Sequence, residues 1–245
     1  MKKSIYLLFL ALTVISCADP GYKEVPFGGM KGRVQEVTNR VRMPEMWFAG
    51  NTGSDVMSVN KSIYDINGNE ICSAIIDTTG VVESEAESLF ENGICVRSVN
   101  KSYGHIIARL NLSSQKDDIL EYLQEMNGRN VRLSVKKTSF LGWHRTEISE
   151  NGKLTSINVV RTDLKGYPKS LKFMDGQGNI LTRETNKYDK KHNIIEKHVL
   201  NGNEERIVYT DYITFDEHGN WTQARTYNKH RLPEHIVERD IIYWE

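Results

Sequence analysis

The sequence predicts an all-β protein, a mainly antiparallel sheet of hairpins and meanders with one short α-helix near residues 115–126. Short runs rich in Val, Ile, Thr, Tyr and Phe are typical of strands. Asn-Gly, Gly-Asn and Asp-Gly pairs separate these runs, and such residues tolerate the positive φ angles that tight hairpin turns require. The chain has 245 residues, which is enough for one large β domain or two small ones.

The N-terminus predicts export and lipid anchoring. Lys2 and Lys3 precede an apolar run over residues 5–15, which is shorter than the roughly 20 residues that span a bilayer but fits the core of a secretory signal. The run ends in Val-Ile-Ser-Cys at Cys17, which is typical of a lipobox. We therefore expect a signal peptide over residues 1–16, acylation of Cys17 and a lipidated tether over residues 17–27.

The composition limits the classes of partner that the chain is expected to bind. The chain carries 32 basic and 32 acidic residues, so it has no global field that would attract nucleic acid. Acyl chains on a cysteine contribute about 0.8 kcal/mol for each buried methylene, so several chains hold a domain on a membrane durably. We expect a location in the cell envelope, anchored by lipid to the outer membrane on its periplasmic or surface side. The expected partners are the membrane and a glycan or an envelope protein.

Turn signals divide the remaining chain, residues 28–245, into strands. Strand-forming or alternating segments cover residues 31–42, 154–161, 206–215 and 238–243. The strongest turn signals lie at residues 67–69, 92–93, 151–152, 175–179, 201–203 and 219–220.

One stretch favours a helix instead. Residues 114–117 resemble a capping box, and apolar residues between Ile119 and Met126 fall on one helical face. Asn127 and Gly128 are typical of a helix C-terminus. This helix would divide the domain into two β segments, residues 28–112 and 129–245.

A turn motif repeats along the chain and carries a family resemblance. Tyr-Asp-Ile-Asn-Gly-Asn at residues 64–69 is echoed at residues 188–193 and 215–220, with a looser, expanded copy at residues 173–179. These turns resemble the YD (RHS-type) repeat, and the lipobox setting resembles uncharacterised lipoproteins of Bacteroides. The opening strand at residues 31–37 and the closing strand at residues 239–243 fit that pattern. The likeness is best over residues 148–245, and the repeats are too few for the closed shell of large RHS proteins.

Two cysteines remain after the lipobox. Cys72 and Cys95 each follow an Asn-Gly turn signal, so they would face each other if their strands were neighbours. A disulfide is permitted outside the cytoplasm. Two buried free thiols explain the pair equally well.

The sequence contains no recognisable catalytic or metal-binding constellation, and we expect no enzyme, no cofactor and no metal. Asp65, Asn67 and Asn69 imitate the start of a calcium loop, but its later ligands are missing and a turn explains them better. His192 and His198 share a strand face, where solvated side chains are the better explanation. A carboxylate pair for glycoside hydrolysis is defined by separation in space, so sequence spacing does not reveal one.

Aromatic residues are the remaining candidates for ligand contact. Trp47, Trp143, Trp221 and Trp244 are best explained as core residues. Trp143 and Trp221 are the two that we single out as candidates for stacking on a ligand, Trp221 because it directly follows a turn.

Three functions are consistent with these features. The first is a non-catalytic binding or scaffolding module on the envelope, and every recognisable feature concerns anchoring or strand pairing. The second is a hydrolase of envelope polysaccharide with an acid and a base carboxylate. The third, prompted by the RHS resemblance, is an immunity-type partner of a secreted toxin.

Overall fold

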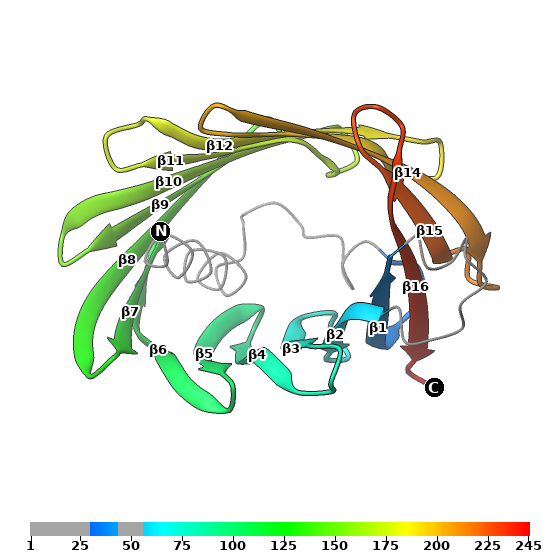
Figure 1. Cartoon of the computed structure of the whole chain (residues 1–245). Coiled ribbons are helices and arrows are strands. Elements are labelled where there is room, and N and C mark those ends of the chain that lie inside the picture. The colour runs from blue at the N-terminus through cyan, green and yellow to red at the C-terminus, as the bar shows by residue number, and fades with distance from the viewer. Residues whose placement is uncertain (1–29, 44–55) are drawn as a thin grey trace.

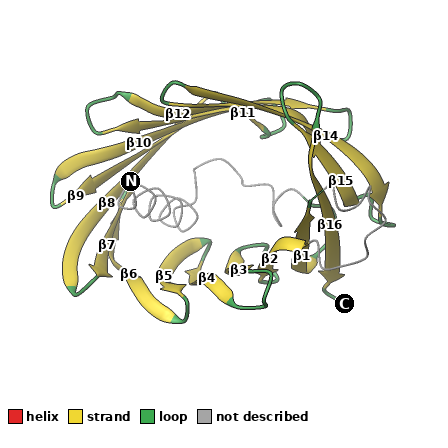
Figure 2. Ribbon diagram, viewed as in Figure 1, coloured by secondary structure: helices red, strands yellow, loops and turns green. Residues whose placement is uncertain are grey.

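The chain forms one closed antiparallel β-barrel. The computed structural model describes residues 30–43 and 56–245, and these contain sixteen strands. Each strand pairs with its neighbours in sequence, and β1 pairs with β16 to close the ring (Figure 1). The barrel is flattened in cross-section when viewed along its axis (Figure 1). In the described residues all regular structure is strand, and loops connect the strands (Figure 2).

The strands are of similar length and run around the barrel in sequence order. They are β1 (Val34–Arg42), β2 (Val56–Tyr64), β3 (Glu70–Ile76), β4 (Val82–Glu91), β5 (Ile94–Ser102), β6 (His105–Lys116), β7 (Ile119–Met126), β8 (Arg129–Phe140), β9 (Trp143–Glu150), β10 (Lys153–Thr162), β11 (Pro168–Asp175), β12 (Ile180–Tyr188), β13 (Ile194–Asn201), β14 (Glu204–Phe215), β15 (Trp221–Tyr227) and β16 (Pro233–Tyr243).

The predicted meander sheet with one helix is wrong, because the sheet closes on itself. Val37 of β1 lies opposite Ser62 of β2 on one side and opposite Ile241 of β16 on the other. Closure leaves no unpaired strand edge, which removes the template for edge-to-edge aggregation. The predicted division into segments 28–112 and 129–245 disappears with the helix, since β6, β7 and β8 are consecutive members of the same sheet.

The segment predicted as a helix forms the end of β6, a tight turn and β7. Leu120, Tyr122 and Gln124 alternate with more exposed neighbours, which is the period of a strand. β7 pairs along its whole length with both β6 and β8. Asn127 and Gly128 have φ angles of 50° and 72°, so they form a two-residue hairpin turn where a helix end was expected.

Many hairpins share one five-residue turn. In the first of them, the Asp65 carboxylate accepts hydrogen bonds from the backbone N–H groups of Asn67 and Asn69, both at 2.9 Å. This local bonding is why Asp begins turns. The same backbone pattern begins at Asp65, Asp77, Asp163, Asp175, Asp189, Asp216 and Asn228. The turn at Asp175 is therefore a regular member, and the expanded turn that the sequence suggested is wrong.

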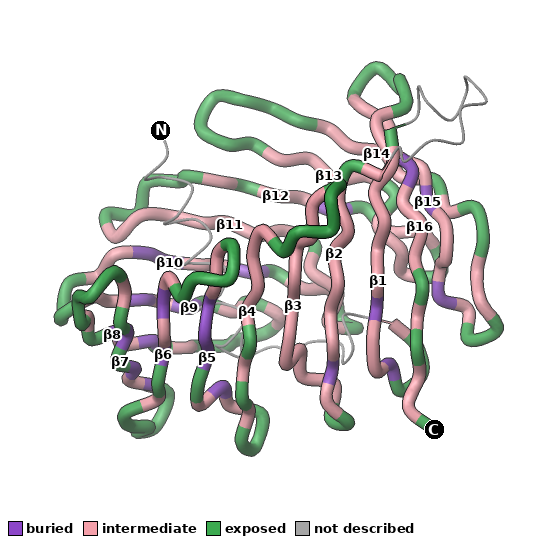
Figure 3. The backbone as a smooth tube through the Cα atoms, turned by 60° about the horizontal axis from the view of Figure 1, so that its bottom comes forward, coloured by how far each residue is buried: buried purple, intermediate pink, exposed green. Residues whose placement is uncertain are grey.

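Alternate residues of each strand face the barrel lumen, and they provide the core. Tyr122 of β7 is fully buried and donates a hydrogen bond to the Cys95 carbonyl of β5 across 3.1 Å, although β6 lies between their strands. Such a contact is possible only on the concave side. The largest apolar cluster lies there, formed by Cys95, Leu110, Leu120, Tyr122, Leu133, Val135 and Ile148. Buried positions (purple) are accordingly frequent on the β5–β9 wall (Figure 3).

Candidate functional site, a pocket in the barrel lumen

A pocket of about 510 Å³ opens into the lumen beside this apolar cluster. Its walls come from β2, β3, β4 and β11–β16, and from the hairpin turns that follow β2, β10, β12 and β14. We call this feature the lumenal pocket. Phe90 of β4 lines it and also packs against the apolar cluster, so the two features share a border. A barrel of this many strands encloses more space than its side chains fill, which explains why a pocket remains.

Tyrosines at the ends of strands fix the pocket rim. The Tyr188 hydroxyl donates to the Pro168 carbonyl at 2.7 Å, and the Tyr212 hydroxyl donates to the Ile194 carbonyl at 2.9 Å. Each bond joins the end of one strand to the beginning of a neighbouring hairpin arm. Burial raises the pKa of both phenols to about 12, so both hydroxyls remain donors at neutral pH. Tyr188 and Tyr212 therefore each tie adjacent hairpins together.

Arg239 of β16 supplies a positive charge to the pocket, whose lining also includes the carboxylates of Glu70 and Glu184. Its guanidinium lies 3.4 Å above the centre of the Trp221 ring, and its Nε donates to Asn39 Oδ1 at 2.8 Å. Among the described residues, it forms no ion pair with a carboxylate. Burial lowers the pKa of Arg239 to about 10, so the group stays charged at neutral pH. Arg239 is half-buried, and its guanidinium faces the pocket.

Hydrogen-bond acceptors line the opposite side. Asn186 of β12 has a side chain that is 7% exposed, and its Nδ2 donates to Pro168 O at 3.3 Å and to Glu184 Oε1 at 3.0 Å. Its Oδ1 is buried and has no hydrogen-bond partner in the described part of the chain. Burial raises the pKa of Glu70, although hydrogen bonds from Ser62 and Ser73 lower it.

A polar clamp closes the barrel beside the pocket. Asn220 accepts a hydrogen bond from the Lys31 N–H at 2.7 Å, and its Nδ2 donates to the Lys31 carbonyl at 2.8 Å and to the Tyr243 hydroxyl at 2.7 Å. Tyr243 also donates to the Asp216 carboxylate. Burial would raise the pKa of Asp216, but the bonds from Tyr243 and from the Asn220 N–H keep it below its ordinary value. The clamp joins the residues before β1 to the turn between β14 and β15.

The register assigns the opposite strand faces to the exterior. Tyr64 and Tyr188 come from strands on separate parts of the ring yet line one pocket, so their face is the lumenal one. Arg239 shares that face, and its neighbours Glu238 and Asp240 therefore point outward.

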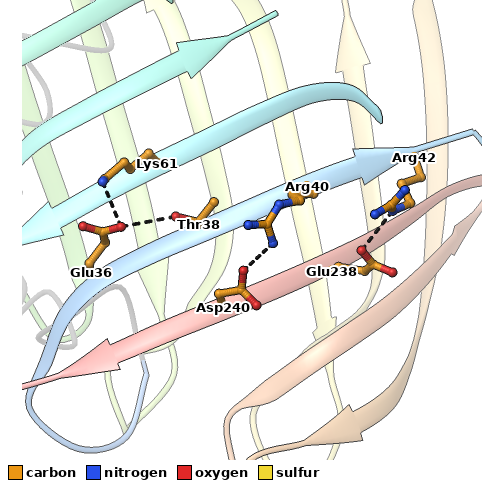
Figure 4. Close-up of polar contacts among 7 residues, drawn as sticks. All are labelled: Glu36, Thr38, Arg40, Arg42, Lys61, Glu238 and Asp240. Atoms are coloured by element: carbon orange, nitrogen blue, oxygen red, sulfur yellow. Dashed lines mark hydrogen bonds and ion pairs between the residues drawn. The ribbon is translucent and has the colours of Figure 1, made fainter. Parts of the chain in front are cut away.

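Ion pairs recur on this exterior, beside exposed apolar side chains such as Leu123 and Trp143. On β1, β2 and β16, the pairs are Glu36 with Lys61 at 2.8 Å, Arg42 with Glu238 at 2.9 Å, and Arg40 with Asp240 (Figure 4). Outward pairs recur on β4 with β5, on β6 with β7, on β9, and on β12 with β13, formed by Lys101 with Glu85 and Glu87, Arg109 with Glu125, Arg145 with Glu147, and Lys187 with Glu196.

Charged side chains on this outer face occupy positions where a membrane-spanning barrel would be apolar. A barrel that spans a bilayer carries an outward apolar band, and an Arg or Lys at the bilayer midplane costs about 2–4 kcal/mol. Lys61 and Arg109 lie near the middle of their strands, where such a band would run. The described residues also include no helix that is long and apolar enough to cross a membrane, a finding that does not bear on strands.

The structure separates the two tryptophans proposed for stacking. Trp221 lines the lumenal pocket and packs against Tyr212, with ring centres 5.5 Å apart. Trp143 is on the outer face, 47% exposed, with the Arg161 guanidinium 5.4 Å from its ring centre. Trp221 alone of these two is therefore placed to contact a lumenal ligand.

The two cysteines lie apart from each other, and so do the two histidines that the sequence analysis paired. Both cysteines are free: Cys72 is half-buried on the outer face of β3, whereas Cys95 is buried in the lumenal cluster of β5. They lie on opposite faces, so the disulfide that the sequence allowed does not form. His192 stacks on Tyr167 at a turn, with ring centres 4.3 Å apart, and His198 bonds Glu196 on the outer face. Cys17, the signal segment and the tether lie outside the described residues.

Sequence reasoning missed the polar residues of the pocket. Arg239 had been noticed only as part of a closing strand, and Asn186 and Glu184 had no motif around them. Their side chains meet because the ring closes, and that depends on strand order. The alternation of Arg239 with outward acidic neighbours on β16 was the one local signal that an inward Arg was present.

Among known proteins, this chain is similar only in the shape of its fold to the two solved structures described below. No family model matches the chain, and no curated protein matches it. A porin-like protein from Bacteroides uniformis is similar, with 8% sequence identity, a TM-score of 0.49, and coverage of 86% of this chain and 98% of that one. A porin-like protein from Bacteroides vulgatus has 9% identity, a TM-score of 0.43 and the same coverages. Both come from the genus named by the sequence resemblance, and similarity this low assigns no function.

Proposed function

We propose that the protein is a lipid-anchored barrel of the cell envelope that holds a small ligand in its lumenal pocket. The observation that carries the proposal is the lumenal pocket, which contains the half-buried Arg239, within a wall whose outer face carries many ion pairs. In this proposal the barrel stands in water beside a membrane, and Cys17 provides the attachment. Pockets of this size and chemistry are the usual form of small-molecule sites.

Binding is tested by filling the pocket. Leu171 of β11 lines the pocket, and Lys172 beside it points outward. Leu171→Trp should abolish ligand-induced thermal stabilisation in a screen of envelope glycan fragments, whereas Lys172→Trp should leave it unchanged. Ligands that stabilise the wild type and Leu171→Trp equally would place binding elsewhere and contradict the proposal.

Anchoring is tested by fractionation. Cys17→Ser should move the protein from the membrane fraction to the aqueous fraction, because no acyl chain would then be attached. Retention of Cys17→Ser in the membrane fraction would contradict the lipid-anchor part of the proposal.

A second candidate function is hydrolysis of a polysaccharide. The observation that favours it is that two carboxylates, Glu70 and Glu184, line the same pocket, and burial raises the pKa of Glu70 as an acid catalyst requires. The same glycan screen, scored for cleavage products, separates the two functions. Cleavage that disappears in Glu70→Gln would favour hydrolysis over binding.

A further inference from the structure

We infer that the lumenal pocket selects an acidic sugar, a pyranose ring that carries a carboxylate. The inference deepens the proposed function and rests on the pocket being a binding site. Three features of the pocket, each requiring a different complement, define this class of ligand.

The first feature is a cation that forms no ion pair with a carboxylate of the described residues. Arg239 keeps its charge, and one nitrogen, Nε, is already bonded to Asn39. The Trp221 ring covers one face of the guanidinium and holds it in place. A guanidinium fixed in this way offers paired N–H donors whose geometry matches a carboxylate. The ligand should therefore carry an anionic group.

The second feature is a buried acceptor that has no donor among the described residues. The buried Asn186 Oδ1 has no partner in the described part of the chain, and its orientation is fixed because Nδ2 faces two acceptors, Pro168 O and Glu184 Oε1. Glu70 and Glu184 line the same pocket, but their oxygens already have donors: Glu70 Oε1 accepts from Ser62 Oγ at 3.0 Å, and Glu184 Oε1 lies 3.2 Å from Lys197 Nζ. A simple aromatic acid brings no hydroxyl donor to Asn186 Oδ1, whereas a sugar brings several.

The third feature is the aromatic lining. Tyr64, Tyr188, Tyr212 and Trp221 line the pocket, and the hydroxyls of Tyr188 and Tyr212 are held by backbone carbonyls. Rings fixed in this way present carbon surface without losing conformational freedom on binding. The C–H face of a pyranose ring is complementary to such surface. Together, the anion site, the acceptor and the aromatic wall fit one sugar acid.

The test uses three sugars that share one ring and differ in charge: D-glucuronate, D-glucose and D-glucosamine. Binding to the purified protein is measured by titration calorimetry. We expect glucuronate to bind at least about tenfold more tightly than glucose, as a charge-assisted hydrogen bond contributes, and glucosamine to bind most weakly. Arg239→Gln should remove the preference for glucuronate. Arg183→Gln, which removes an exposed Arg from the outer face of β12, should keep it.

The outcomes separate this inference from the proposed function. Equal binding of all three sugars, or a preference for glucosamine, would overturn the acidic-sugar class and leave a binding pocket. In another outcome, none of the three sugars binds, while another ligand stabilises the wild type but not Leu171→Trp. That result would also overturn the acidic-sugar class and leave a binding pocket. Failure of every ligand in both experiments would overturn both. A matching circular dichroism spectrum and unfolding midpoint establish that Arg239→Gln is folded, and Arg239→Lys provides a second variant that retains charge but loses the planar pair of donors.

Discussion

Asn220 should hold the barrel closed, and its replacement should cost more than replacement of an equivalent turn residue. The Asn220 side chain is 6% exposed and forms three hydrogen bonds, two with the Lys31 backbone and one with Tyr243. At about 1 kcal/mol net for each bond, Asn220→Ala should lower the free energy of unfolding by about 3 kcal/mol. Asn179 occupies the same position in another turn, but it is exposed and its side chain bonds only Asp175.

The assay is urea unfolding followed by tryptophan fluorescence. Asn179→Ala should cost less than about 1 kcal/mol, since an exposed side-chain bond contributes little. Hydrogen exchange should also show that Asn220→Ala loses amide protection in β1, where the clamp acts. Equal losses for the two variants, or unchanged protection of β1, would refute the claim that this turn closes the ring.

Three further predictions concern the turns, the pocket and the core. Gly176→Ala should destabilise by about 1–3 kcal/mol in urea unfolding, because an added Cβ would lie 1.9 Å from the Leu154 carbonyl oxygen; an unchanged midpoint would contradict the close approach. The raised pKa of Glu70 means that its protonated form favours the folded state, a contribution that is complete below the unfolded pKa near 4.5 and lost as pH rises through the folded value. Glu70→Gln should therefore be more stable than wild type at pH 7 and match it at pH 4, and a constant difference in urea midpoint would oppose this. Tyr122→Phe should lower stability by about 1–1.5 kcal/mol by leaving the buried Cys95 carbonyl without this donor, and a neutral effect would place that hydroxyl outside the core network.

Local chemistry made the hairpins visible in the sequence. Asp65 and Asn69 predict their turn because the donor and the acceptor of its hydrogen bond lie within five residues of each other. The same is true at Asp189, where His192 adopts a φ of 67° at the position that glycine holds in most related turns. His192 stands where the motif has glycine, and its ring stacks on Tyr167 in this turn.

The helix prediction failed because periodicity over a short apolar segment is ambiguous. The spacing of Ile119 and Leu123 fits one face of a helix. In the structure, however, Leu123 is 46% exposed on the outer face of the barrel. Pairing with two neighbouring strands decided the outcome, and those partners are not encoded in the segment itself. Tertiary context overrode local spacing.

Closure of the ring and the composition of the pocket could not be predicted for a related reason. The Arg40 and Asp240 pair joins residues at opposite ends of the chain, and nothing local specifies that β1 should meet β16. Arg239 becomes a pocket residue only because this meeting turns it inward beside Trp221. Sequence reasoning could therefore select Trp221 as a ligand-contacting candidate but had no basis for choosing Arg239.

The central claim is that the exterior of the barrel faces water, and nitroxide labels on the membrane-bound protein test it most directly. Labels at Thr38, Thr185 and Ser134 would lie on the outer face of strands around the ring, in a Cys72→Ser background that removes the outward native thiol. We expect a water-soluble nickel complex to relax all three labels more strongly than oxygen does. Preferential relaxation by oxygen at all three sites would reveal a lipid-facing belt and contradict the account.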